Sequence, residues 1–116
     1  MKYTEHAESC KNQLGRSFLE VHRFLDQFYR DFGLGHRSML HHQLGIEVIE
    51  KEFGEEARRP AELHIREDTG GDLPEDWSYY GKPLFVQIKE YARLCAALRQ
   101  LYGKETFQKV QQKISL

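Results

Sequence analysis

Two segments of this sequence carry side chains that can bind a metal ion or move a proton. The first contains the adjacent histidines His41 and His42, and the second contains His64 and Asp68, four residues apart. Residues i and i+4 share one face of a helix, so His64 and Asp68 should be neighbours. Imidazole and carboxylate groups are ligands of Zn²⁺ and related ions, which makes these four residues candidate metal ligands. Weaker candidates are His6, His22 and His36.

The same residues permit a catalytic metal site, a structural metal site, or no metal at all. Three protein ligands and a water would form the site of a hydrolase, with Glu47 or Glu67 as the base that activates the water. Four protein ligands would close a structural site. Without metal, the histidines would be hydrogen-bonded core residues, and Asp68 would orient His64 or cap a helix. The spacing matches none of the diagnostic metal motifs, so all three alternatives stay open.

Helical periodicity covers most of the chain, and Gly or Pro residues mark the boundaries between the predicted helices. Apolar residues at steps of three and four predict a helix from Ser17 to Phe32 that stops at Gly33. A weaker pattern predicts a helix from Thr4 to Leu14. Another helix is predicted from His36 to Phe53, and a short one from Pro60 to Asp68.

The predicted helix over residues 36–53 places its three histidines on different faces. At about 100° per residue, His42 points with the apolar Ile46, and His36 points to a polar face. His41 is rotated by about 100° from His42. The three imidazoles therefore cannot all face one ion from a regular helix, and a metal site would take one or two of them.

The C-terminal part is predicted to form two helices after an ordered aromatic loop. The loop, residues 72–83, contains Trp77 and either seals the end of the core or forms a recognition surface. From Pro83 onward apolar residues alternate steps of four and three, and a last helix follows Gly103. This regular seam packs inside the monomer or forms a homodimer interface. Its members are Leu84, Ile88, Tyr91, Leu98 and Tyr102.

The composition is that of an ordinary soluble globular protein. The 116 residues are 40% hydrophobic and 30% charged, with a formal net charge of -1, so the chain lacks the basic field that nucleic-acid binding requires. No apolar stretch is long enough for a signal peptide or a membrane span, which predicts a cytoplasmic protein. Cys10 and Cys95 are expected to be free thiols. We therefore expect one all-α domain over residues 1–116, a compact bundle of five to six helices with one ordered aromatic loop.

Several motifs occur together in an order that resembles a known family. They are His36-Arg37, Leu40-His41-His42-x-x-Gly45-Ile46 and Ala61-Glu62-x-His64-x-x-Glu67-Asp68. The sequence resembles an uncharacterised family of small bacterial and phage helical proteins over roughly residues 6–80. Residues 81–116 would then be a C-terminal helical extension. The resemblance implies no activity, because none is assigned to that family.

A fainter likeness concerns the metal-dependent phosphohydrolases that are named for a His-Asp doublet at a helix end. Residues 61–64 look similar to the start of this motif, but Ile65 occupies the position of the metal-binding Asp. The departure removes one ligand, so the likeness adds little weight to the hydrolase alternative.

The function expected first is that of a small binding or regulatory helical protein. Its histidines would serve the interior, and its surface would contact a protein partner or a second copy of the chain. The alternatives are a metal-dependent hydrolase and a structural-metal domain, both using His41 or His42 with His64 and Asp68 to hold an ion such as zinc. No Ser or Cys lies in an elbow motif and no phosphate loop is present, so a covalent mechanism is not expected.

Overall fold

A computed structural model of the chain describes residues 1–81 and 88–114, and of Ile88 only the backbone. The prediction of an all-α fold is confirmed: these residues form helices and contain no strand. The helices of seven residues or more are α1 (Tyr3–Leu14), α2 (Leu19–Leu25), α5 (Gln43–Phe53), α6 (Arg58–Thr69), α7 (Ile88–Tyr102) and α8 (Lys104–Ile114). Shorter pieces are α3 (Tyr29–Phe32), α4 (Arg37–Leu40) and the 3-10 turns η1 (Gly33–His36), η2 (Glu55–Ala57) and η3 (Trp77–Tyr79).

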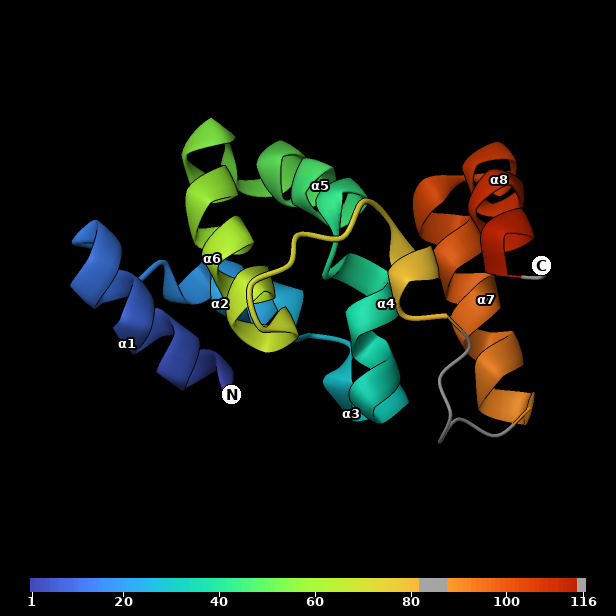
Figure 1. The fold of residues 1–116 in the computed structure, drawn as a ribbon, viewed down its shortest axis with the longest axis horizontal. Helices are drawn as coiled ribbons and strands as arrows, with labels where there is room; N and C mark the ends of the chain where they lie inside the picture. The colour runs from blue at the N-terminus through green and yellow to red at the C-terminus, as the bar shows by residue number, and fades with distance from the viewer. Residues whose placement is uncertain (82–87, 115–116) are drawn as a thin grey trace.

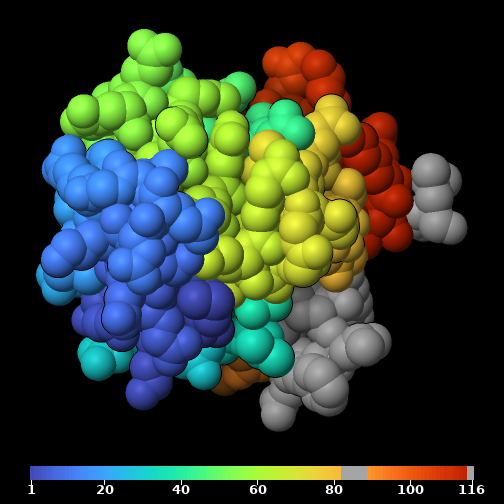
Figure 2. All heavy atoms as spheres, turned by 60° about the vertical axis from the view of Figure 1, so that its left-hand side comes forward, coloured from blue at the N-terminus to red at the C-terminus, as the bar shows by residue number. Residues whose placement is uncertain are grey.

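The helices form two groups that are joined by α4 and α5 (Figure 1). Helices α1, α2 and α6 pack together at one end, and α7 packs with α8 at the other. Figure 2 shows the N-terminal helix lying beside the yellow-green α6 on one face of the molecule. One hydrophobic core runs through both groups, from Val21 in α2 to Val110 in α8. No helix among the described residues is long and apolar enough to cross a membrane.

Two of the predicted helices are each broken in the middle, which corrects the sequence-based expectation. The helix predicted over residues 17–32 is divided, because α2 ends at Leu25 and α3 begins at Tyr29. The helix predicted over residues 36–53 is divided between Leu40 and Gln43. Periodicity alone did not reveal these breaks, because the apolar steps continue across them. The two interruptions matter because both lie beside the candidate site.

The break between α4 and α5 depends on a capping histidine and a glycine. The Nδ1 atom of His42 accepts a hydrogen bond from the backbone N–H of Gly45 at 3.1 Å, which caps α5. Its Nε2 atom donates to the Ser38 carbonyl oxygen at 2.9 Å. A Cβ atom at Gly45 would lie 1.9 Å from the carbonyl oxygen of Leu40, so the turn requires a glycine. Burial lowers the pKa of His42 to about 4, so this capping imidazole is neutral.

The aromatic loop closes the core between the two groups of helices. Trp77, in η3, is 1% exposed, and its ring stacks on Tyr102 and Phe107 at centroid distances of 5.2 and 6.2 Å. Its Nε1 atom donates to Gln111 in α8 at 3.2 Å. Of the two roles considered for this loop, the burial of Trp77 supports the sealing of the core.

The residues of the predicted C-terminal seam that the structure describes pack within the chain. Leu98 is 2% exposed, and the Tyr102 hydroxyl donates to the carbonyl oxygen of Met39 in α4. Tyr91 packs against the same core. Leu84 and the side chain of Ile88 lie outside the described part of the chain.

Candidate metal centre

Four side chains with metal-binding groups meet in the interior of the N-terminal group of helices. They are Asp26, His41, His64 and Asp68, and one ligand atom from each lies within 4.8 Å of the others. Three of them are residues that the sequence analysis proposed as candidate ligands. They come from three separate segments: the end of α2, the break between α4 and α5, and α6.

The two histidines of this group place Nε2 between the two carboxylates. His41 Nε2 lies 3.1 Å from Asp68 Oδ2 and 3.3 Å from Asp26 Oδ1. His64 Nε2 lies 3.1 Å from Asp26 Oδ1 and 3.3 Å from Asp68 Oδ2. Atoms that bind one ion at about 2.0–2.2 Å are themselves on the order of 3.0–3.5 Å apart. These four separations fall in the range of such edges, and two of them are also hydrogen bonds.

The charged groups of this cluster are largely shielded from water. The side chains of His41 and His64 are fully buried, that of Asp68 is 4% exposed and that of Asp26 is 15% exposed. Burial raises the pKa of each carboxyl, but hydrogen bonds from the surrounding histidines outweigh it and hold both pKa values well below their usual range. Two ionised carboxylates thus face each other across the imidazoles, an arrangement that favours a cation between them.

Two further histidines extend the cluster at its two ends. His36 Nε2 lies 3.3 Å from Asp26 Oδ1, and its Nδ1 atom donates to the Gly33 carbonyl oxygen at 2.7 Å. His6, in α1, places Nε2 3.1 Å from Asp68 Oδ1. A histidine whose Nδ1 is held by a backbone carbonyl or a carboxylate is the usual form of a metal ligand.

Glu67 holds His6 in place. Its Oε1 atom lies 3.0 Å from His6 Nδ1, and its Oε2 atom accepts from the Ser9 hydroxyl at 2.5 Å. Burial lowers the pKa of His6, but the hydrogen bonds to Asp68 and Glu67 outweigh it and raise the pKa overall. Glu67 therefore orients an imidazole, which differs from the role of base considered for it above. Glu47, the other candidate base, is exposed on α5.

His22 occupies the outer side of His64. The Nδ1 atoms of these two buried rings are 2.9 Å apart, so one proton must lie between them. Burial, with the neighbouring His64 and His6, lowers the pKa of His22 to about 4, so its ring is neutral. When this proton lies on His22, His64 Nε2 carries a hydrogen and donates to Asp26. When it lies on His64 Nδ1, the Nε2 lone pair is free to bind an ion, which is the tautomer that a metal ligand needs.

The structure separates His42 from this cluster, although the sequence analysis grouped it with His41. Both of its ring nitrogens are used in the turn before α5. Conversely, the sequence analysis missed Asp26. The sequence does contain a pattern that could have pointed to Asp26. His22 and Asp26 are four residues apart, as are His64 and Asp68. Asp26 follows the last residue of α2, where the break turns its carboxylate toward the cluster.

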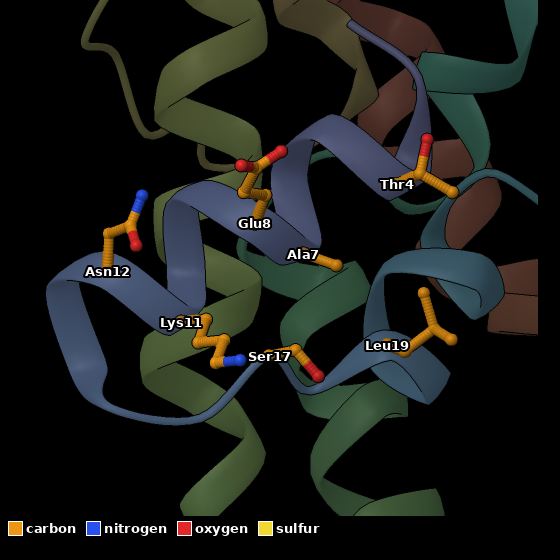
Figure 3. A pocket seen from close by; sticks show the side chains of 7 residues that line it. All are labelled: Thr4, Ala7, Glu8, Lys11, Asn12, Ser17 and Leu19. Atoms are coloured by element: carbon orange, nitrogen blue, oxygen red, sulfur yellow. The ribbon is translucent and has the colours of Figure 1, made fainter.

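A cavity of about 480 Å³ lies elsewhere, between α1 and the residues that lead into α2 (Figure 3). It is open to solvent, and its walls come from α1 and from the residues that lead into α2. The lining residues are Thr4, Ala7, Glu8, Lys11, Asn12, Ser17 and Leu19. None of them belongs to the group of Asp26, His41, His64 and Asp68, so cavity and cluster are separate features.

Comparison with known proteins places the whole cluster inside the segment that matches one protein family. The chain matches none of the curated proteins and none of the solved structures with which it was compared. Residues 1–82 match a family described as a domain of unknown function, DUF6915, and this match includes all four clustered ligands. The resemblance to an uncharacterised family is thereby confirmed, and the chain belongs to the DUF6915 family.

Proposed function

We propose that this protein is a metal-binding domain that holds a divalent transition-metal ion at Asp26, His41, His64 and Asp68. The observation that carries the proposal is the convergence of two imidazoles and two carboxylates from three separate segments within 4.8 Å. Two nitrogen and two oxygen donors suit zinc, iron or manganese. The Nδ1 atoms of His64 and His36 are hydrogen-bonded to His22 and to the Gly33 carbonyl oxygen, and such partners are usual for histidines at metal sites.

Elemental analysis tests this proposal directly. Protein purified without a polyhistidine tag should contain at least about one transition-metal ion per chain, because a site of four converging protein donors binds such an ion tightly. His64→Ala and Asp26→Asn should lose most of that metal. Asp76→Asn is the matched control for Asp26→Asn, because it neutralises a buried carboxylate that lies outside the cluster. Wild-type protein that stays free of metal after incubation with zinc, iron and manganese would sink the proposal.

The ion would also join parts of the fold that are distant in sequence. Asp26, His41 and His64 lie on separate elements, so an ion bound to all three cross-links them. Metal binding then contributes to the free energy of folding. The protein could therefore use the ion to stabilise its fold, or respond to the ion by a change in stability, which are a structural and a regulatory role.

Hydrolysis is a second candidate function, and the access of solvent to the cluster favours it. The Asp26 side chain is 15% exposed, and Arg37, which is 31% exposed, places Nη2 3.8 Å from Asp68 Oδ1. A divalent ion supplies Lewis-acid chemistry and lowers the pKa of water. The Arg37 guanidinium would hold an anionic part of the substrate at this edge.

A panel of ester and phosphoester substrates tests the second candidate. Metal-loaded protein should hydrolyse at least one of them, and His64→Ala should abolish the turnover while circular dichroism shows a helical fold. Arg37→Gln should raise KM more than it lowers kcat if the guanidinium contributes to substrate binding alone. Full metal content without turnover of any substrate would leave the structural or regulatory role.

A further inference from the structure

Asp68 presents its two carboxylate oxygens to different imidazoles. Its Oδ1 atom lies 3.1 Å from His6 Nε2, whereas its Oδ2 atom lies 3.1 Å from His41 Nε2 and 3.3 Å from His64 Nε2. A carboxylate whose oxygens face separate sets of donors is able to bridge two metal ions. In known two-metal sites the ions are about 3.5–4 Å apart.

The rings of His6 and His64 have the relative orientation that such a pair of ions requires. They stack with a centroid distance of 3.6 Å and an interplanar angle of 21°. Each ring directs Nε2 toward a different oxygen of Asp68. Lone pairs on two stacked, nearly parallel rings point to two positions rather than converge on one. The stacking distance therefore resembles the separation of ions in two-metal sites.

We propose that the centre holds a second divalent ion, bound by His6 Nε2 and Asp68 Oδ1, so that Asp68 bridges a pair of ions. This inference rests on the proposed function, because the first ion occupies the group of Asp26, His41, His64 and Asp68. His6 lies outside that group, which is why it serves the second position.

The surroundings of His6 are built to present its Nε2 atom. The ring is fully buried, Glu67 Oε1 lies 3.0 Å from Nδ1, and the Ser9 hydroxyl fixes Glu67 from the other side. Carboxylate–histidine pairs of this kind orient metal ligands. The Arg37 guanidinium and the Met1 ammonium lie 3.8 and 3.9 Å from Asp68 Oδ1. Both cations would be displaced from this oxygen when the second ion binds.

His36 lies at the end of the cluster that is opposite to His6. Its Nε2 atom lies 3.3 Å from Asp26 Oδ1, and the Gly33 carbonyl oxygen holds its Nδ1. The first ion would keep Asp26, His41, His64 and the Oδ2 atom of Asp68 as ligands when Asp68 Oδ1 is shared with a second ion. His36, which like His6 lies outside this group of four, contacts the Asp26 carboxylate and helps to position it.

The experiment uses the full-length protein loaded with Mn²⁺ after removal of other metals. Wild-type protein should bind about two ions per chain by elemental analysis. Two Mn²⁺ ions joined by a carboxylate should give an exchange-coupled electron paramagnetic resonance spectrum, in place of the six-line spectrum of an isolated ion. The spectrum of the wild type requires no variant, so the test survives any folding defect of the mutants.

Variants then assign the second position to His6. His6→Ala should bind one ion per chain and show the six-line spectrum, with a helical fold by circular dichroism. Glu67→Gln should keep the first ion and weaken the second about 10–100-fold, because it changes only the group that orients His6. Asp76→Asn, the matched control outside the cluster, should keep two coupled ions.

The outcomes separate this inference from the proposed function. One uncoupled ion in both wild type and His6→Ala would overturn the second ion and leave the metal-binding proposal standing. Two ions in the wild type that persist in His6→Ala would overturn the assignment to His6. Protein that binds no Mn²⁺, iron or zinc would overturn both.

Discussion

His41 and His42 are adjacent in the chain, yet their side chains serve different parts of the molecule. His41 Nε2 lies 3.1 Å from Asp68 Oδ2 inside the candidate metal-binding cluster. The ring of His42 caps α5 and binds the Ser38 carbonyl oxygen. This division is possible because the backbone leaves the helix between α4 and α5. The turn that separates the two imidazoles is therefore part of the construction of the site.

We expect Gly45→Ala to disrupt both the fold and the cluster. The new Cβ would lie 1.9 Å from the carbonyl oxygen of Leu40 and 2.5 Å from its carbonyl carbon, and neither backbone atom can move without opening the turn. Urea unfolding should show a loss of about 3 kcal/mol or more, and metal content should fall because His41 moves. Glu47→Ala, on the exposed side of the same helix, is the control and should change stability by less than about 0.5 kcal/mol. Equal stability of Gly45→Ala and wild type would show that the turn is not tight.

Removal of metal should lower the thermal stability of the wild-type protein. An ion at a free concentration of 100 times its Kd adds about 2.7 kcal/mol to the folded state, which corresponds to a shift of Tm on the order of 10 °C for a domain of this size. Differential scanning calorimetry with and without a chelator measures the shift. His64→Ala should show no chelator effect, because the ion would lack one of its four ligands. A chelator effect of the same size in both proteins would contradict this assignment.

Replacement of His22 should weaken metal binding without removing a ligand. His22 Nδ1 lies 2.9 Å from His64 Nδ1 and fixes the ring and tautomer of that ligand. Loss of such an outer partner typically costs about 10–100-fold in affinity, so His22→Phe should raise the Kd by that factor with unchanged stoichiometry. His22→Asn offers a side-chain oxygen as acceptor and should recover part of the affinity. Isothermal titration with Zn²⁺ measures all three proteins, and identical Kd values would show that His22 only fills space.

Asp76 should make the attachment of α8 depend on pH. Lys113 Nζ lies 2.6 Å from its Oδ2 atom, and the backbone N–H of Ser78 donates to Oδ1 at 2.9 Å. Burial raises the pKa of Asp76, but these hydrogen bonds outweigh it and lower the pKa below its usual value of 3.8. The folded state then binds fewer protons than the unfolded state, so this stabilisation is present above about pH 4 and is lost as the pH falls.

Asp76→Asn tests this dependence, because Asn keeps the cap of η3 but carries no charge. The variant should unfold at lower urea concentration than the wild type at neutral pH. The difference should shrink between about pH 5 and pH 3, as the wild-type carboxyl becomes protonated. If the difference in stability between the two proteins stays constant across this pH range, the charge of Asp76 does not contribute to stability.

The sequence by itself determined the all-α class, most helix ends and three of the four clustered candidate ligands. These features follow from local rules. The steps of three and four define amphipathic helices, glycines such as Gly15 and Gly70 end them in left-handed conformations, and the spacing of His64 and Asp68 places both on one helix face.

Only the tertiary structure decided which imidazoles meet and which do not. Asp26 joins the cluster because α2 ends one residue before it, and His42 leaves the cluster because its ring is needed to cap α5. The apolar periodicity runs through both interruptions, so local pattern alone predicts unbroken helices there. The breaks are stabilised by contacts between residues far apart in the chain, such as that of Asp26 with His64, and long-range contacts of this kind are not encoded in any short window of sequence.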